Sequence, residues 1–560
     1  MKKFSIIMLA GVAALALGAC GKKDKAADAP ASASSAQGAK ASAASPLDSR
    51  FTLKGGDPLD VDAFLALFPE KSRPTYKSAE FDKSLGATVV TGLRFADAED
   101  GEAVVVERAE FFGVDMAAIE RVKSAANAGS EAPFETIFQK VRFHGVSTEG
   151  YAEGDETADL KIGAVEFDTL QVRQGGLAVG DETDGGGARF FNSFNLAGLY
   201  VKDMTAKAEG TNSPKLGLTL PDLRVVGIGG GKVAAIIAND LDYTMNHSDE
   251  SLAILRTSMG PEGVMFFDGP LGGFIAPKSQ GMTAKQFEWR NIDFSGIMDW
   301  GLKGEKPPLT AEKLLDLGTM RMTKVDTYVN GKHAATMAEA TMSAGEFTWL
   351  APSNIRIDTK GAVYDLTAYV ADTEEAALKI LRDNGLNSVK GDGYASWVWN
   401  AKSGAADLNY VGNMEKFASF SMSTGFSDLK LADLAAAIED GETNVIAGHG
   451  AFRNFSIKLK DDKALDAVFA LAALQTGGTG EELRNSAPGL VRITGSQFTQ
   501  INPRFSGYVD AVATFLAKGG TLEISAAPAK PASFATLQST AMTAPQTLPD
   551  ALDLKVTRKD

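Results

Sequence analysis

A short alternating signature recurs along the chain and limits its fold more than any other feature. It has an apolar residue, a polar residue, an apolar or aromatic residue, any residue, a glycine and an aliphatic residue. Clear copies occupy residues 141–146, 194–199, 223–228 and 292–297, and looser copies occupy residues 88–93 and 109–114. Alternation with a period of two predicts half-buried antiparallel strands, and the glycine predicts a bulge or a close strand approach.

The copies are irregularly spaced, so the chain is not a solenoid with a fixed repeat. We therefore predict an α+β, sheet-rich fold with long meandering antiparallel sheets and with helices increasing in the C-terminal half. The predicted helices are residues 310–317, 373–384, 429–439, 464–474 and 509–518. The predicted domains are a sheet-rich domain over residues 48–330 and a mixed helix and sheet domain over residues 331–560.

The first 19 residues predict an export signal. Lys2 and Lys3 precede the apolar run 4–17, which is too short to span a bilayer stably. The run ends in Leu17-Gly18-Ala19-Cys20, which resembles the lipobox of bacterial lipoproteins. The resemblance implies cleavage before Cys20, the only cysteine, and acylation of its thiol and new amino group. The alternative is an ordinary secretory signal in which Cys20 is incidental.

Residues 20–47 are predicted to be the lipidated cysteine and a disordered tether. Residues 21–46 contain no large apolar side chain, so burial cannot offset the chain entropy that folding would cost. Gly21, rather than Asp, follows the cysteine and favours the periplasmic face of the outer membrane, with the inner membrane as the alternative. The net charge of −15 argues against nucleic acid. The expected partners are a membrane, held through lipid on Cys20, and a lipid or envelope protein.

A second resemblance covers residues 85–450. A helix, Gly385, the triplet 391–393, the strand 394–399, a turn and the strand 407–411 follow one another. This order looks like large, mostly uncharacterised periplasmic proteins of alphaproteobacteria. The sheet-rich part looks more distantly like AsmA-like envelope proteins, whose long curved sheets are associated with lipid handling. The resemblance rests on no catalytic or binding motif and therefore implies no site residues.

Residue patterns for common active sites are missing from the sequence. His144, His247, His333 and His449 include no pair at metal-ligand spacing, and GxSxG does not occur. The stretch 227–232 departs from both phosphate-loop patterns and predicts a connection from a strand to a helix. Trp397 and Trp399 share one strand face, which favours core packing over a ligand platform. We therefore predict no catalytic, metal-binding or cofactor-binding residue, and no cofactor.

Two acidic loops, 97–102 and 181–187, are candidate calcium ligands, although neither follows the EF-hand order and solvated turns are favoured. The leading hypothesis is a non-enzymatic, membrane-anchored envelope lipoprotein. It would bind an apolar or amphiphilic envelope component or scaffold a partner. One alternative is a periplasmic or surface hydrolase acting on polysaccharide or peptidoglycan. Another is a calcium-dependent adhesin.

Overall fold

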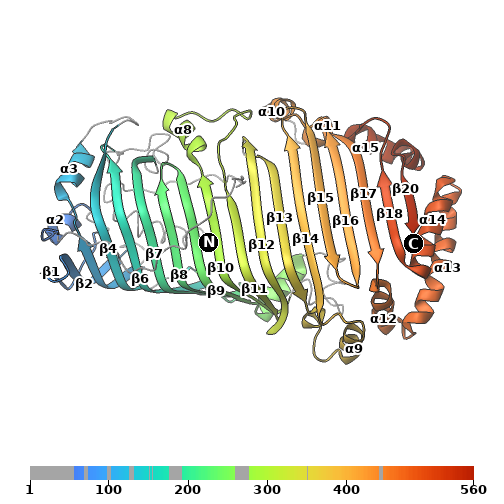
Figure 1. Ribbon diagram of the computed structural model, residues 1–560, viewed down its shortest axis with the longest axis horizontal. Coiled ribbons are helices and arrows are strands. Elements are labelled where there is room, and N and C mark those ends of the chain that lie inside the picture. Colours follow the sequence, from blue (N-terminus) through green and yellow to red (C-terminus); the bar gives the residue numbers. More distant parts are fainter. Residues whose placement is uncertain are drawn as a thin grey trace.

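One antiparallel sheet of twenty strands runs along the length of the molecule (Figure 1). The computed structural model describes residues 56–68, 73–96, 102–124, 132–149, 152–153, 156–175, 192–258, 277–349, 351–439 and 445–560. The strands are β1 Ser78–Asp82, β2 Ala87–Ala96, β3 Ala103–Phe112, β4 Phe134–Glu149, β5 Ala152–Glu153, β6 Glu156–Arg173, β7 Phe194–Glu209, β8 Lys215–Gly229, β9 Lys232–Asn246, β10 Ser279–Asp293, β11 Thr319–Val329, β12 Lys332–Thr348, β13 Ala351–Tyr364, β14 Val389–Asn400, β15 Ala405–Met414, β16 Ala418–Ser427, β17 Ala451–Asp461, β18 Gly520–Ala526, β19 Ala532–Ser533 and β20 Lys555–Lys559.

The strands follow one another across the sheet in chain order, and each is antiparallel to its neighbours. Two very short strands lie outside this order, because β5 pairs with β6 and β19 pairs with β17. As a result β4 pairs with β6, and β18 pairs with β20. The predicted sheet-rich, meandering antiparallel fold is therefore confirmed. The sheet continues across residue 330 through the hairpin of β11 and β12.

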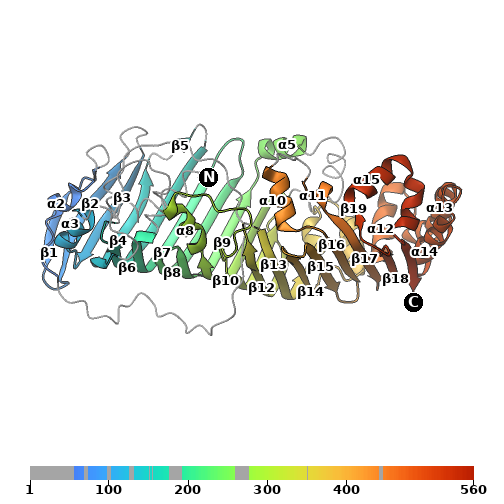
Figure 2. The same cartoon turned by 90° about the horizontal axis from the view of Figure 1, so that it is seen from above.

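Helices gather toward the C-terminal end of the sheet (Figure 2), as the sequence predicts. The α-helices are α2 Val61–Leu65, α3 Met116–Ser124, α5 Asp249–Ser258, α8 Ser295–Lys303, α9 Glu375–Asp383, α10 Leu431–Glu439, α11 Val445–His449, α12 Ala464–Thr476, α13 Gly480–Thr499, α14 Arg504–Lys518, α15 Phe534–Thr543 and α16 Leu548–Ala551; the 3-10 helices are η2 Leu366–Tyr369 and η3 Pro545–Thr547. Helix α14 packs on β20, the last strand, and α13 packs on α14.

Two lines of left-handed residues cross the sheet. The first line lies on alternate strands from β2 to β13, and the second lies on β6, β8, β10 and β12. Their φ angles fall between 40° and 64°: Gly92, Gly145, Asp203, Asp240, Lys324 and Gly361 form the first line, and Thr169, Gly227, Asn291 and Glu346 form the second. The predicted role of the signature glycine is confirmed at Gly92, Gly145 and Gly227, where the ladder of paired residues is interrupted. At Gly198 the prediction is wrong, because this glycine pairs regularly with Asp168 and Val226.

Each left-handed residue shifts the alternation of side chains by one position. Val141 and Phe143 are buried before Gly145, and Val146 is buried directly after it, so the apolar side chains stay on one face. A Cβ atom on Gly145 would lie 2.5 Å from Cδ of Glu107 on the neighbouring strand. Glycine at this position therefore suits the left-handed backbone angle and leaves room for the Glu107 side chain.

A large apolar core fills the N-terminal end of the sheet. Helix α2 begins at Asp60, whose carboxylate accepts a hydrogen bond from the Ala63 amide. The helix places Phe64 against Phe111, with ring centroids 5.6 Å apart. Edge-to-face contacts continue across the sheet through Phe143 and Phe167. Helix α2 and the first strands therefore bury one face of the sheet together.

Four of the five predicted helices are present, as α9, α10, α12 and α14. The helix predicted at 310–317 is wrong, because this segment is irregular and forms bridges from Glu312 to Thr348 and from Asp316 to Asp293. The strand predicted at 292–297 ends at Asp293, and helix α8 follows. A Cβ atom on Gly296 would lie 2.1 Å from the Lys313 carbonyl oxygen, so this glycine admits the backbone of the bridged segment.

The glycine-rich stretch 227–232 joins two strands, and the predicted connection to a helix is wrong. Gly230 and Gly231, with φ angles of 56° and 77°, form the turn between β8 and β9. Two consecutive left-handed residues suit the tight turn of an antiparallel hairpin. The sequence Gly-Gly is therefore explained by turn geometry.

Candidate functional site

An uninterrupted row of apolar side chains crosses the middle of the sheet. Sixteen residues follow one another as direct cross-strand partners: Phe111, Val141, Phe167, Leu199, Val225, Ile236, Trp289, Met320, Met342, Ile357, Ala395, Tyr410, Met422, Ile457, Ile524 and Val556. Direct cross-strand partners lie on the same face of a sheet. We call this set the apolar row.

Burial of the apolar row changes along the sheet. Its first members, Phe111, Val141 and Phe167, are at most 4% exposed beneath the N-terminal core. From Leu199 to Val556 the members are all partly exposed or exposed. Ile357 and Tyr410 reach 41% and 44% exposure. The row thus leaves the core and continues as an accessible apolar strip over the middle and C-terminal strands.

The opposite face carries charged side chains on many of the strands, and we call these side chains the charged row. Glu110, Arg142 and Glu166 are successive cross-strand partners at the N-terminal end of the sheet. The Glu166 carboxylate accepts hydrogen bonds from Lys140 Nζ and Arg142 Nε, both at 2.6 Å. The side chains of Lys140 and Glu166 are 3% and 8% exposed. These ion pairs compensate the buried charges on this face.

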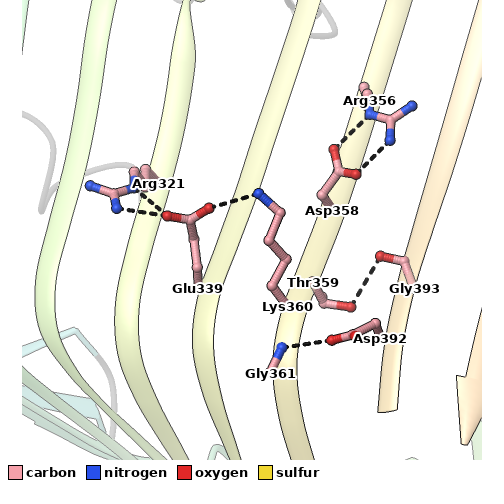
Figure 3. A network of polar contacts seen from close by, with 9 residues as sticks. All are labelled: Arg321, Glu339, Arg356, Asp358, Thr359, Lys360, Gly361, Asp392 and Gly393. Atoms are coloured by element: carbon pink, nitrogen blue, oxygen red, sulfur yellow. Dashed lines mark hydrogen bonds and ion pairs between the residues drawn. The ribbon is translucent and has the colours of Figure 1, made fainter. Parts of the chain in front are cut away.

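The charged row continues over the middle of the sheet, where Figure 3 shows its contacts. The Glu339 carboxylate lies between Arg321 and Lys360, with closest distances of 2.6 Å and 3.2 Å. The hydrogen bond from Arg321, followed by that from Lys360, lowers the pKa of Glu339. Arg356 donates two hydrogen bonds to Asp358 on the same strand. The hydrogen bond to Asp358 raises the pKa of Arg356.

A left-handed residue meets an acid at the edge of this network. The Gly361 amide donates a 2.6 Å hydrogen bond to Oδ1 of Asp392 on the next strand (Figure 3). The ladders to β12 and to β14 both skip Gly361, so this residue is not paired with a residue on either neighbouring strand. Asp392 supplies the missing acceptor. Glu339, with Arg321 and Lys360, and Asp392, with the Gly361 amide, therefore hold adjacent strands together.

The four histidines lie in separate surroundings. His144 is 3.7 Å from Glu110, His247 Nδ1 is 3.1 Å from Ser251 Oγ, and His333 Nε2 is 3.1 Å from Asp326. His449 ends helix α11. Within the described ranges, no three His, Cys, Asp or Glu side chains gather at a metal-binding distance. The acidic loops 97–102 and 181–187 lie outside those ranges, apart from Glu102.

The two strand tryptophans pack together with helix α10. Trp399 is 7% exposed, and its indole N–H donates a 2.9 Å hydrogen bond to the Leu429 carbonyl. Trp397 packs against the same cluster, and its N–H donates to the Pro352 carbonyl at 3.2 Å. The predicted core packing is confirmed for Trp399, while Trp397 is partly exposed at the edge of the cluster. The helix α10 contact was not apparent from the sequence, because 30 residues separate Trp399 from Leu429.

The lipobox, Cys20 and the tether lie outside the described residues, which begin at residue 56. Among the helices that the structure describes, none combines the length and apolar character needed to cross a bilayer. The molecule is therefore defined by its one long antiparallel sheet, with an accessible apolar row on one face and ion pairs on the other.

A family model described as "Uncharacterized protein" matches residues 412–559. This range covers about a quarter of the chain, from the end of β15 to β20. No curated protein matches the chain.

Proposed function

We propose that this chain is a lipoprotein anchored in the bacterial envelope through Cys20, and that it binds an amphiphilic envelope component along the apolar row. The anchoring half rests on the sequence Leu17-Gly18-Ala19-Cys20 and the polar stretch that follows it. The outer membrane, facing the periplasm, is the proposed location, because Gly21 follows the cysteine. The protein acts by binding and not by catalysis.

One observation carries the binding half: the apolar row stays accessible over most of the sheet. A sheet face that is meant only to support a fold is normally covered by another layer. Contiguous exposed apolar surface marks interaction sites in soluble proteins. Because the opposite face carries ion pairs, the face with the apolar row is the one suited to an apolar ligand. A strip across many strands also suits an elongated molecule with hydrocarbon chains.

Site-specific photocrosslinking in intact cells tests the binding half on the full chain. Replacing Met342 by p-benzoylphenylalanine places the probe in the apolar row, and replacing Thr341 places it one residue away on the opposite face. We expect crosslinks to acetate-labelled lipid from position 342 and not from position 341. A protein crosslink without lipid at position 342 would refute lipid binding and favour the scaffolding hypothesis.

The anchoring half has its own test. We expect the full chain to incorporate labelled palmitate, and the Cys20→Ala variant to lose that label and leave the membrane fraction. A Cys20→Ala variant that stays in the membrane fraction, with the wild type unlabelled, contradicts anchoring through this cysteine. The crosslinking result is independent of this outcome.

A further inference from the structure

An apolar pocket lies at one end of the strands, between the sheet and three helices. Its volume is about 660 Å³, within the range of roughly 300–1,000 Å³ typical of ligand pockets. Helices α10, α11 and α15 contribute seven of the eleven lining residues. Figure 1 shows these helices near the same ends of the strands. The lining residues are Leu309, Trp349, Ala351, Trp399, Leu431, Leu434, Ala435, Ile438, Val445, Ile446 and Phe534.

Every lining side chain is apolar, and this restricts what the pocket accepts. On α10, Leu431, Leu434 and Ile438 follow the spacing of one helix face. The Trp399 N–H is already bonded to a backbone carbonyl, so its ring supplies carbon surface. A peptide segment entering the pocket would bring amide and carbonyl groups that the lining side chains cannot pair, and burying such unpaired groups is unfavourable. A hydrocarbon chain brings no such groups.

The pocket opens from the same sheet face as the apolar row. On β14, Ala395 belongs to the row, and Trp397 and Trp399 follow on the same face because they are two and four residues further on. Beside them Ile357 pairs with Ala395, and Ile355 pairs with Trp397. The distance along β14 from Ala395 to Trp399 is about 13 Å, at about 3.3 Å per residue. Apolar surface therefore leads from the row to the pocket.

We propose that the pocket binds one acyl chain of a phospholipid, whose other chain lies along the apolar row. The proposal rests on the proposed function and adds a place for one chain. A free fatty acid would need the pocket alone and would leave the adjoining strip uncovered. The second chain of a phospholipid uses that strip, and its headgroup stays in water outside the apolar lining.

Tryptophan fluorescence provides a local readout. Trp349 and Trp399 line the pocket, and Trp289 lies in the apolar row. The full chain, anchored on phosphatidylcholine vesicles with dibrominated acyl chains, is compared with the same protein on unbrominated vesicles. Brominated carbons quench an indole that they contact. We expect brominated lipid to quench the tryptophan fluorescence of the wild type. In Trp349→Phe/Trp399→Phe most of the quenching that comes from the pocket should be lost.

Two glutamates introduced at the pocket test whether an acyl chain occupies it, without disturbing the core. Ile438 and Ile446 line the pocket but are 53% and 62% exposed, so we expect the fold to tolerate Ile438→Glu/Ile446→Glu. The matched control is Ile254→Glu/Ile493→Glu, at 54% and 74% exposed positions on α5 and α13. We expect roughly tenfold weaker lipid binding in the pocket variant, since two lost methylene burials at about 0.8 kcal/mol each exceed a factor of ten.

The outcomes separate the two proposals. Quenching of Trp349 and Trp399 that persists in the pocket variant overturns the pocket, while a lipid crosslink at position 342 upholds the apolar row. Quenching by dibromostearic acid but not by the phosphatidylcholine overturns the phospholipid assignment. Absence of both pocket quenching and the crosslink at position 342 overturns both proposals.

Discussion

Removing the Glu166 carboxylate should destabilise the N-terminal half of the sheet far more than removing an exposed acid. Glu166 accepts hydrogen bonds from Lys140 and Arg142, both at 2.6 Å, and Lys140 is 3% exposed. In Glu166→Gln the Lys140 ammonium would stay buried without a counter-ion. Breaking a buried ion pair on one side costs about 3–5 kcal/mol. Two lost charge-assisted hydrogen bonds, at about 1.5–3 kcal/mol each, give a similar figure.

Hydrogen exchange of the amides in β4 and β6 measures this loss, because it reports the local free energy of opening. A loss of about 4 kcal/mol corresponds to an exchange rate roughly 1,000-fold faster when each opened segment recloses faster than its amides exchange. Glu209→Gln is the matched control, since its ion pair with Lys215 is about half exposed on both sides. We expect exchange in the control to stay close to that of the wild type.

The double variant Lys140→Met/Glu166→Leu separates charge from packing. Replacing both members of a buried pair by apolar residues of similar size is often neutral. Its exchange rates should therefore return toward the wild type. A Glu166→Gln variant with unchanged exchange in β4 and β6 would refute the argument, because the Lys140 ammonium would then be hydrated instead of buried without a counter-ion. A double variant as unstable as Glu166→Gln would show that shape, and not charge, determines the loss.

Three further predictions concern stability. Gly385 has φ of 73° and Gly489 lies inside α13, and a Cβ atom would meet nothing within 4 Å at either position. Gly385→Ala should therefore lower the free energy of unfolding by about 1–2 kcal/mol, and Gly489→Ala should raise it by about 0.5–1 kcal/mol. Urea unfolding measures both changes, and a change of the same sign and size in the two variants would contradict the argument from backbone angles. Because the folded-state pKa of Glu339 is lowered by Arg321, its stabilisation is present above the unfolded pKa and is lost as the pH falls through the folded pKa. Glu339→Gln should thus have a lower free energy of unfolding than the wild type near pH 7 and the same free energy of unfolding in strong acid. A difference between the two proteins that does not change with pH would contradict this prediction. Thr479 completes a capping box with Glu482, so Thr479→Ala should lower the unfolding free energy by about 1 kcal/mol and speed exchange at the start of α13, whereas unchanged exchange would show that the cap contributes little.

The sheet-rich fold could be predicted because its strands repeat a local pattern. Gly92, Gly145 and Gly227 recur at the same place in that pattern, and each takes a left-handed angle. The lines across the sheet were only partly visible, since Asp203 and Lys324 occupy the same structural position without glycine. Asp adopts left-handed angles more readily than most residues, but a lysine in the sequence does not predict such an angle. A glycine-based pattern therefore finds some members of each line and misses the others.

Helix α13 was missed for a local reason. Pro488 lies inside the helix and Gly489 follows it, and both residues normally predict a break. The helix forms nonetheless, with a capping box at its start and α14 packed along it. The segment 310–317 shows the opposite error, since its residues suit a helix but bridge to β10 and β12. Tertiary contacts override local preference in both cases.

The candidate site could not be derived from the sequence because it depends on strand register. Met342, Ile357 and Ala395 are ordinary apolar residues in three different strands, and only pairing aligns them. A shift of one residue in any strand would exchange its apolar and charged faces. The ion pairs of the opposite face oppose such a shift, because Glu339 would lose both Arg321 and Lys360. The charged row therefore specifies the register on which the apolar row depends, so loss of these ion pairs should disturb lipid contact at position 342 as well as stability.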